Sequence, residues 1–113
     1  VISDFTGSDS QKFHVYLNNG KYAFVTPNNL ALFVVNDSAE NGAFIKSDPG
    51  QHATNFFDIT PVSSGPWAGK ACNIKTVSGK SLDIFEGKVG NNIAVVQWQT
   101  HGGNNQCWVV TPA

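Results

Sequence analysis

Short apolar segments rich in Val, Ile and Phe alternate with polar clusters rich in Asn and Gly along the whole chain. β-Branched and aromatic residues pack well on the surface of a sheet, and only four Leu are present to favour helices. The polar clusters are typical of turns and recur about every 8–12 residues, a spacing found in barrels and sandwiches built from hairpins. The pattern therefore predicts an all-β domain with almost no helix.

Similar strand ends recur three times along the chain. An apolar residue followed by Thr-Pro occurs at 25–27, 59–61 and 110–112, each time after an aromatic residue. Residues 43–59 also match residues 94–110 without a gap. Threefold repetition of short strands closes a small barrel, so we predict three unequal repeats within one domain. The predicted domain is 1–113, with repeats at about 1–27, 28–61 and 62–113. A competing register matches 13–23 with 72–82 and gives two units instead.

The charge balance excludes several classes of protein. The 113 residues include seven Lys, no Arg and eight acidic residues, for a formal net charge of −1. A composition of this kind lacks the excess of Lys and Arg that a nucleic-acid binder, or a helix lying on an anionic membrane, requires. No apolar run reaches the roughly 18 residues of a membrane span. We therefore expect no nucleic-acid partner and no membrane insertion, while the compartment stays open between secreted and leaderless cytoplasmic.

Motifs of catalysis and metal binding are missing from the sequence. It contains no His-Glu-x-x-His, Gly-x-Ser-x-Gly or phosphate-binding loop and no closely spaced Cys/His set. We therefore expect no enzyme, no catalytic residues, no metal ion and no cofactor. Cys72 and Cys107 lie 35 positions apart, at the first and last expected strands of one repeat. A disulfide and two free thiols are equally consistent with this placement.

The last repeat contains several motifs in a distinctive order. A Gly79-Lys80 turn precedes Leu82-Asp83, and Trp98, a Gly-rich loop and Gln106-Cys107-Trp108 follow. This order resembles the R-type lectin family, the ricin B chain-like β-trefoils, whose repeats close on Gln-x-Trp. The resemblance covers residues 72–110, about a third of the chain. It implies a β-trefoil fold and carbohydrate binding without turnover.

The chemistry of these residues agrees with sugar binding. A carboxylate at Asp83 can accept from two hydroxyls, Asn105 can donate and accept, and Trp98 offers a flat apolar face for a sugar ring. The resemblance implies that these three residues bind galactose- or N-acetylgalactosamine-type sugars. It further implies that Gln106 supports the Asp and that His101 contacts ligand. Burial of Trp98 in the core, and turn or solvated roles for the polar residues, are the structural alternatives.

The other repeats offer poorer sites. The ungapped match puts Ser47 where Trp98 stands and Asn55 where Gln106 stands, so we expect no sugar in the middle repeat. A gapped match puts Asp4 and Tyr16 opposite Asp83 and Trp98, which gives a candidate weaker second site. Few sites per chain favour avidity through a multivalent glycan surface or a homo-oligomer.

The cysteine pattern departs from the resembled family. Its intra-repeat disulfide would need Cys at Ser81 and near Thr100, and both positions carry hydroxyl residues.

Two functions from different classes follow. The first is a lectin whose partners are the glycans of glycoproteins or glycolipids. The alternative is a β-trefoil protease inhibitor or another protein-binding scaffold with a decayed sugar site. That alternative would use the irregular segment 60–71, which carries Trp67 between Pro66 and Ala68. Inhibition of binding by free galactose would distinguish the two.

Overall fold

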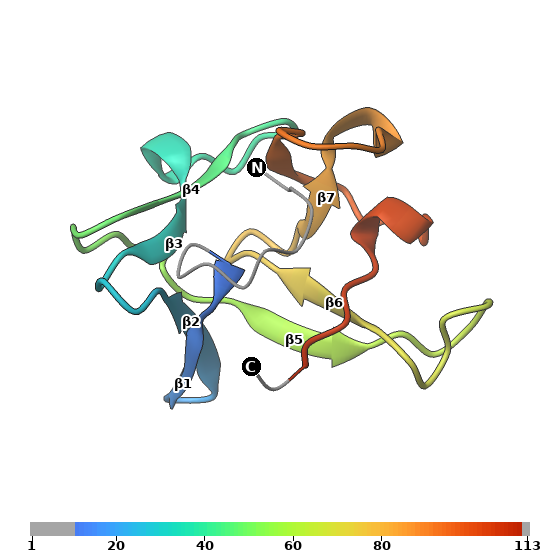
Figure 1. The fold of residues 1–113 in the computed structure, drawn as a ribbon, viewed down its shortest axis with the longest axis horizontal. Helices are drawn as coiled ribbons and strands as arrows, with labels where there is room; N and C mark the ends of the chain where they lie inside the picture. Colours follow the sequence, from blue (N-terminus) through green and yellow to red (C-terminus); the bar gives the residue numbers. More distant parts are fainter. Residues whose placement is uncertain (1–10, 112–113) are drawn as a thin grey trace.

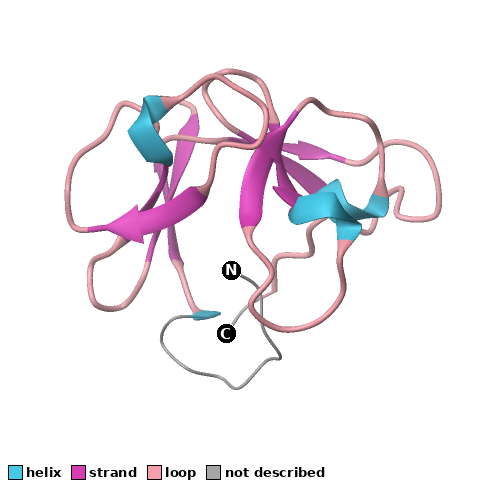
Figure 2. Ribbon diagram, turned by 90° about the horizontal axis from the view of Figure 1, so that it is seen from above, coloured by secondary structure: helices cyan, strands magenta, loops and turns pink. Residues whose placement is uncertain are grey.

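The computed structural model describes residues 11–111, and within this range the structure is built from short β-strands joined by turns (Figures 1 and 2). The strands are β1 (His14–Asn18), β2 (Lys21–Val25), β3 (Ala31–Val34), β4 (Ile45–Asp48), β5 (Asp58–Pro61), β6 (Cys72–Lys75), β7 (Ser81–Ile84) and β8 (Val95–Trp98). Three-residue 3-10 turns are η2 (Val35–Asp37), η3 (Phe85–Gly87) and η4 (Asn104–Gln106). The all-β prediction with almost no helix is confirmed.

The strands form two antiparallel four-stranded sheets, in the orders β1-β2-β3-β4 and β5-β6-β7-β8. In Figure 1 the first sheet lies on the left of the molecule and the second on the right. Turn chemistry defines the hairpins: Asn19 and Gly20 join β1 to β2 with φ values of 52° and 79°. Two successive residues with positive φ are what a tight two-residue hairpin requires, and Asn and Gly adopt that conformation most readily.

Strands β2 to β4 and strands β6 to β8 repeat one plan at a shift of 50 residues. The amide N–H of Thr26 bonds to the carbonyl oxygen of Leu30, as that of Thr76 bonds to the carbonyl oxygen of Lys80. The turns η2 and η3 then follow β3 and β7 at matching places. This regularity extends the sequence match between the middle and last repeats. The predicted repeat boundaries themselves stay a prediction.

The ungapped sequence match is wrong by one residue at β4. Ala31 pairs with Asp48 as Ser81 pairs with Trp98, so Asp48, and not Ser47, is the counterpart of Trp98. Further along, Phe57 bridges to Tyr22 as Trp108 bridges to Cys72, which confirms that Phe57 and Trp108 correspond. The loop after β8 is therefore one residue longer than the loop after β4.

The core lies between the two sheets and draws on both. Phe24 and Phe57 meet edge to face with ring centroids 5.5 Å apart. The cluster contains Phe24, Val34, Ile45, Phe57, Ile74 and Leu82. Trp108 packs against this cluster and donates its Nε1–H to the carbonyl oxygen of Leu82 at 3.0 Å. The prediction that Trp108 belongs to the core, and not to a surface site, is confirmed.

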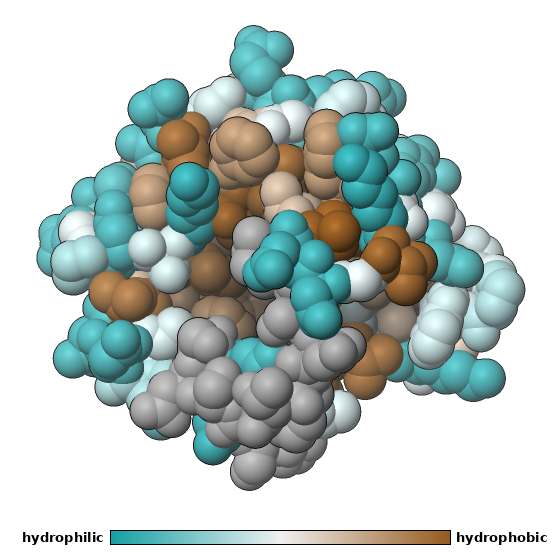
Figure 3. Space-filling model, turned by 45° about the horizontal axis from the view of Figure 1, so that its top comes forward, coloured by the Kyte–Doolittle hydropathy of each residue, from teal (hydrophilic) through white to brown (hydrophobic). Residues whose placement is uncertain are grey.

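Apolar side chains also reach the surface, and Figure 3 shows such patches among polar residues on one face. The exposed large apolar residues include Tyr16, Leu17, Phe44, Trp67, Val77, Val89 and Trp98. They come from several separate segments, so exposure alone does not mark a site. No helix within residues 11–111 is both long and apolar enough to cross a membrane.

Candidate functional site

Strand β7 places Asp83 on the side of the sheet opposite the core. Successive strand residues point to opposite faces, so Leu82 packs in the core cluster while Asp83 points away from it. Asp83 is nevertheless only 4% exposed. A carboxylate this deeply placed needs hydrogen-bond donors around it.

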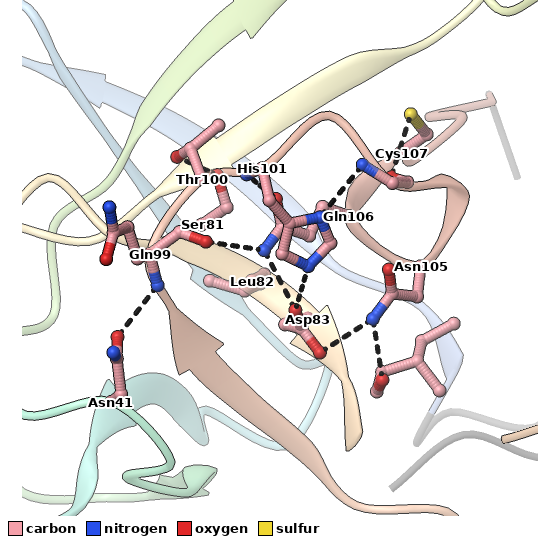
Figure 4. A network of polar contacts seen from close by, with 12 residues as sticks. Asn41, Ser81, Leu82, Asp83, Gln99, Thr100, His101, Asn105, Gln106 and Cys107 are labelled. Carbon is pink, nitrogen blue, oxygen red and sulfur yellow. Dashed lines mark hydrogen bonds and ion pairs between the residues drawn. The ribbon is translucent and has the colours of Figure 1, made fainter. Parts of the chain in front are cut away.

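Two amide side chains from η4 supply those donors (Figure 4). Asn105 donates from Nδ2 to Asp83 Oδ1 at 2.9 Å, and Gln106 donates from Nε2 to Asp83 Oδ2 at 2.8 Å. Gln106 is fully buried; its Nε2 also donates to the Gln99 carbonyl, and its Oε1 accepts the N–H of His101. Gln106 therefore holds the carboxylate from beneath and does not reach the surface itself.

His101 completes the polar group from the loop between β8 and η4. Its Nδ1 accepts the N–H of Gly103 at 3.0 Å, so the proton of the neutral ring lies on Nε2. Nε2 lies 3.5 Å from Asp83 Oδ2. A Cβ on Gly103 would come within 2.6 Å of His101 Cε1 and 2.8 Å of Asn105 Oδ1. Glycine at this position therefore lets both side chains keep their places beside Asp83.

Trp98 ends β8 with 40% of its surface exposed, which places it at the surface and not in the core. The segment before β4 lies against its ring: a Cβ on Gly42 would be 3.6 Å from Trp98 Cζ3. The neighbouring Gln97 is fully buried, and its Nε2 donates to the carbonyls of Ser38 and Glu40. Contacts from the segment that connects η2 to β4 therefore hold this end of β8 in place.

These side chains surround a surface pocket of about 320 Å³. The residues lining it are Asp83, Phe85, Glu86, Gly87, Trp98, His101 and Asn105. Four of the five predicted residues of the main site therefore meet there, and the fifth, Gln106, lies beneath them. The wall formed by η3 was not predicted from the sequence, although Phe85 to Gly87 directly follow the strand that carries Asp83. An aromatic ring, a carboxylate, an amide and an imidazole can together contact both the apolar and the hydroxyl-bearing sides of a small polar ligand.

No protein-family model matches the sequence, and no curated protein does. Among solved structures, the designed threefold-symmetric protein ThreeFoil matches with a TM-score of 0.86 and 24% identity, over 98% of this chain and 79% of that chain. The chain has the β-trefoil fold. An exo-β-1,3-galactanase from Clostridium thermocellum matches with a TM-score of 0.76 and 24% identity, over 94% of this chain but only 23% of the enzyme. Likeness at this identity shows the fold, and the predicted β-trefoil is confirmed.

The middle repeat has no equivalent of the pocket, because side chains fill the corresponding place. Phe33 stands where Asp83 stands in the last repeat, and its ring stacks on His52 with centroids 3.9 Å apart. His52 Nε2 in turn lies 2.8 Å from Oδ1 of Asp48, the counterpart of Trp98. Neither the carboxylate nor the aromatic platform has an equivalent here. The expectation of no sugar in this repeat stays a prediction, now with a physical reason.

The candidate second site of the first repeat is not assembled within the described residues. Asp4 lies outside them. Tyr16 is exposed on β1 and pairs with Ala23 of β2. In the second sheet the residue that corresponds to Ala23 is Asn73, and it pairs with Thr60 of β5. Tyr16 therefore corresponds to Thr60. Its position is thus not the one that Trp98 occupies at the end of β8. Sugar binding at this pair stays a prediction.

Both cysteines are free thiols in the structure. Cys72 Sγ donates to the carbonyl oxygen of Trp108, and Cys107 Sγ donates to that of Gly103. Burial raises the pKa of the Cys72 thiol, and the nearby Cys107 sulfur raises it further. Cys72 is therefore a weak nucleophile at neutral pH. Within residues 11–111, no group of three or more His, Cys, Asp or Glu is placed to hold a metal ion.

The hydroxyl groups of Ser81 and Thr100 are in contact. Ser81 Oγ, which is fully buried, lies 2.7 Å from Thr100 Oγ1. The double variant Ser81→Cys/Thr100→Cys is therefore expected to form a disulfide and to raise the free energy of unfolding by about 3 kcal/mol on the chain-entropy model. Peptide mapping and urea unfolding with and without reductant would show this. A double variant whose stability does not depend on reductant would contradict the expectation.

The loop between β5 and β6 is the segment proposed for protein recognition under the alternative function. It extends from one end of the molecule at the right of Figure 1, and Trp67 within it is 40% exposed. The Trp67 carbonyl accepts the N–H groups of Lys70 and Ala71. Local turns thus order this loop, and its tryptophan is as exposed as Trp98.

Proposed function

We propose that this trefoil is a lectin that binds galactose- or N-acetylgalactosamine-type glycans in the pocket beside Asp83 and Trp98, without turnover. The observation that carries the proposal is the meeting of a held carboxylate and an exposed indole across one small pocket. A sugar presents hydroxyl groups that donate and accept hydrogen bonds, and an apolar face of C–H bonds. In the pocket, Asp83 can bind the hydroxyl groups and Trp98 can stack on the apolar face.

The hydrogen-bond inventory supports binding of hydroxyl groups. A carboxylate has about four lone-pair positions. Asn105 and Gln106 occupy one on each oxygen of Asp83, which leaves accepting capacity for ligand hydroxyls. His101 adds a donor at Nε2 beside them. The two amides also fix the carboxylate before ligand arrives, so little ordering is lost on binding.

The galactose-type specificity is supported by two likenesses. The last repeat resembles R-type lectins at Asp83, Trp98 and Asn105, the positions that bind such sugars in that family. The fold is also shared with a segment of an exo-β-1,3-galactanase, a protein named for a galactose polymer. Both point to the same class of sugar.

The absence of turnover is supported by the bonding of Asp83. Glycoside hydrolysis uses one carboxyl group as a proton donor and a second as a base or nucleophile. Both oxygens of Asp83 accept N–H groups from the amides of Asn105 and Gln106, so both face hydrogen-bond donors. The second carboxylate that lines the pocket, Glu86, is exposed and lies 3.8 Å from the Lys88 ammonium group. This arrangement supports holding a sugar without protonating a glycosidic bond.

Two equally exposed tryptophans give a matched test of the proposal. Trp98→Ala removes the platform and is expected to lower affinity for immobilised galactosides by roughly tenfold or more, as loss of about 1.5 kcal/mol or more of stacking requires. Trp67→Ala is expected to leave this binding unchanged. Surface plasmon resonance on a galactose-bearing surface would measure both. Unchanged binding by Trp98→Ala together with loss in Trp67→Ala would favour recognition through the β5–β6 loop.

A further inference from the structure

Negative charge dominates the pocket. Two carboxylates line it, Asp83 and Glu86, and of the described residues that line it only His101 can carry a positive charge. The partners of Asp83 at Asn105 and Gln106 are neutral amides, which fix the carboxylate but do not cancel its charge. Because Asp83 is almost fully buried, solvent screens that charge only weakly.

The nearby lysine neutralises Glu86 poorly. Lys88 Nζ lies 3.8 Å from Glu86 Oε1, and both side chains are more than half exposed. An exposed ion pair at such a distance is weak and easily exchanged for water. Lys88 also lies over the Phe85 ring, 5.6 Å from its centroid, and is not among the residues that line the pocket. A charged ligand would therefore meet the field of both carboxylates.

The backbone at Glu86 adopts a conformation that its residue type disfavours. Glu86 adopts φ 56° and ψ 17°, in the left-handed region, where its counterpart in η2 is Asn36 at φ 61° and ψ 18°. Asn adopts this conformation readily, whereas Glu does so at a cost in conformational free energy. Strained residues of this kind occur preferentially at functional sites. A glutamate is thus held at the pocket wall where asparagine would fit the backbone better.

We propose that Glu86 is a specificity-determining residue that makes the pocket select sugars by charge. Amino sugars with a free, protonated amino group bind more tightly than the neutral sugar, and sugars that carry a carboxylate bind more weakly. This inference rests on the proposed lectin function and names the ligand class that the same site prefers. Asp83 supplies the fixed buried charge, and Glu86 supplies a second charge at the rim.

The test compares three sugars of one stereochemistry: galactosamine, galactose and galacturonate. At about pH 7 the amino sugar is mostly protonated. Isothermal titration at low salt is expected to show galactosamine binding about threefold more tightly than galactose, and galacturonate about threefold more weakly, the size of effect typical of exposed charge pairs. Both differences should shrink in Glu86→Gln and near 1 M salt, where the Debye length is only about 3 Å.

Asp58→Asn is the matched control, because it removes the same charge from a half-exposed residue that does not line the pocket. It should keep the wild-type order of the three sugars. Equal affinity for all three sugars would overturn the inference and leave the lectin function intact. An order that persists unchanged in Glu86→Gln would overturn the role of Glu86. Binding of none of them would overturn both the inference and the proposed function.

Discussion

Asp83→Asn is expected to lower affinity for galactose-type glycans by about 100-fold, since two charge-assisted hydrogen bonds to ligand hydroxyls are worth about 1.5 kcal/mol or more each. The replacement keeps the shape of the side chain but puts one N–H group among the donors of Asn105 and Gln106. One of those contacts then becomes donor against donor. Both the charge and the fixed orientation of the acceptor are lost.

Asp58→Asn is the control for this prediction. Asp58 is a half-exposed carboxylate that pairs with Lys21 on the strands β5 and β2, and it does not line the pocket. Its replacement changes the net charge equally and should leave glycan binding unchanged. Titration of both variants with galactose would measure their affinities, and circular dichroism would verify that they fold. Wild-type affinity in a folded Asp83→Asn variant would mean that the sugar binds elsewhere.

Gln106→Leu is expected to lower the free energy of unfolding by roughly 3 kcal/mol, because it leaves buried polar groups without their partners. The side chain of Gln106 is fully buried, and it satisfies Asp83 Oδ2, the Gln99 carbonyl and the His101 N–H at once. Leucine has a similar volume, so the loss reflects hydrogen bonding and not a cavity. This is the largest stability effect expected of any residue at the site.

Gln99→Leu is the matched control for Gln106→Leu, since Gln99 is exposed and its bond to Asn41 is made by the backbone N–H. A surface change of this kind is expected to alter stability by less than about 0.5 kcal/mol. Urea unfolding curves of the two variants should therefore differ clearly. Similar curves would mean that the amide network at η4 contributes little to the fold.

The grouping of the candidate site residues around one pocket could be predicted from sequence because these residues lie in one repeat in a fixed order. Asp83 alternates with core residues on its strand, and a pair of polar amides follows a glycine-rich loop before a core tryptophan. Strand alternation and turn chemistry are local properties, and they are visible in a sequence. The same properties predicted the all-β class.

The pocket wall and the repeat register depend on features that are not local in this way. Glu86 reaches the pocket wall because its backbone adopts a left-handed conformation, which glutamate disfavours. The residue type therefore does not predict this position. The shift of one residue between Asp48 and Trp98 arises in a loop whose length differs between repeats. An ungapped comparison cannot register that difference. The hydrogen bond from the Gly42 N–H to the carbonyl of Gln97, next to Trp98, likewise joins segments far apart in the chain.

The chain contains three tryptophans in three different environments: Trp98 in the pocket, Trp67 on the β5–β6 loop and Trp108 against the core. Their indole N–H signals in a two-dimensional NMR spectrum can be followed during titration with galactose. The Trp98 signal is expected to shift in a saturable manner, while the signals of Trp67 and Trp108 are expected to stay in place. A titration that shifts none of the three, or that shifts Trp67 and leaves Trp98 unchanged, would contradict sugar binding in this pocket.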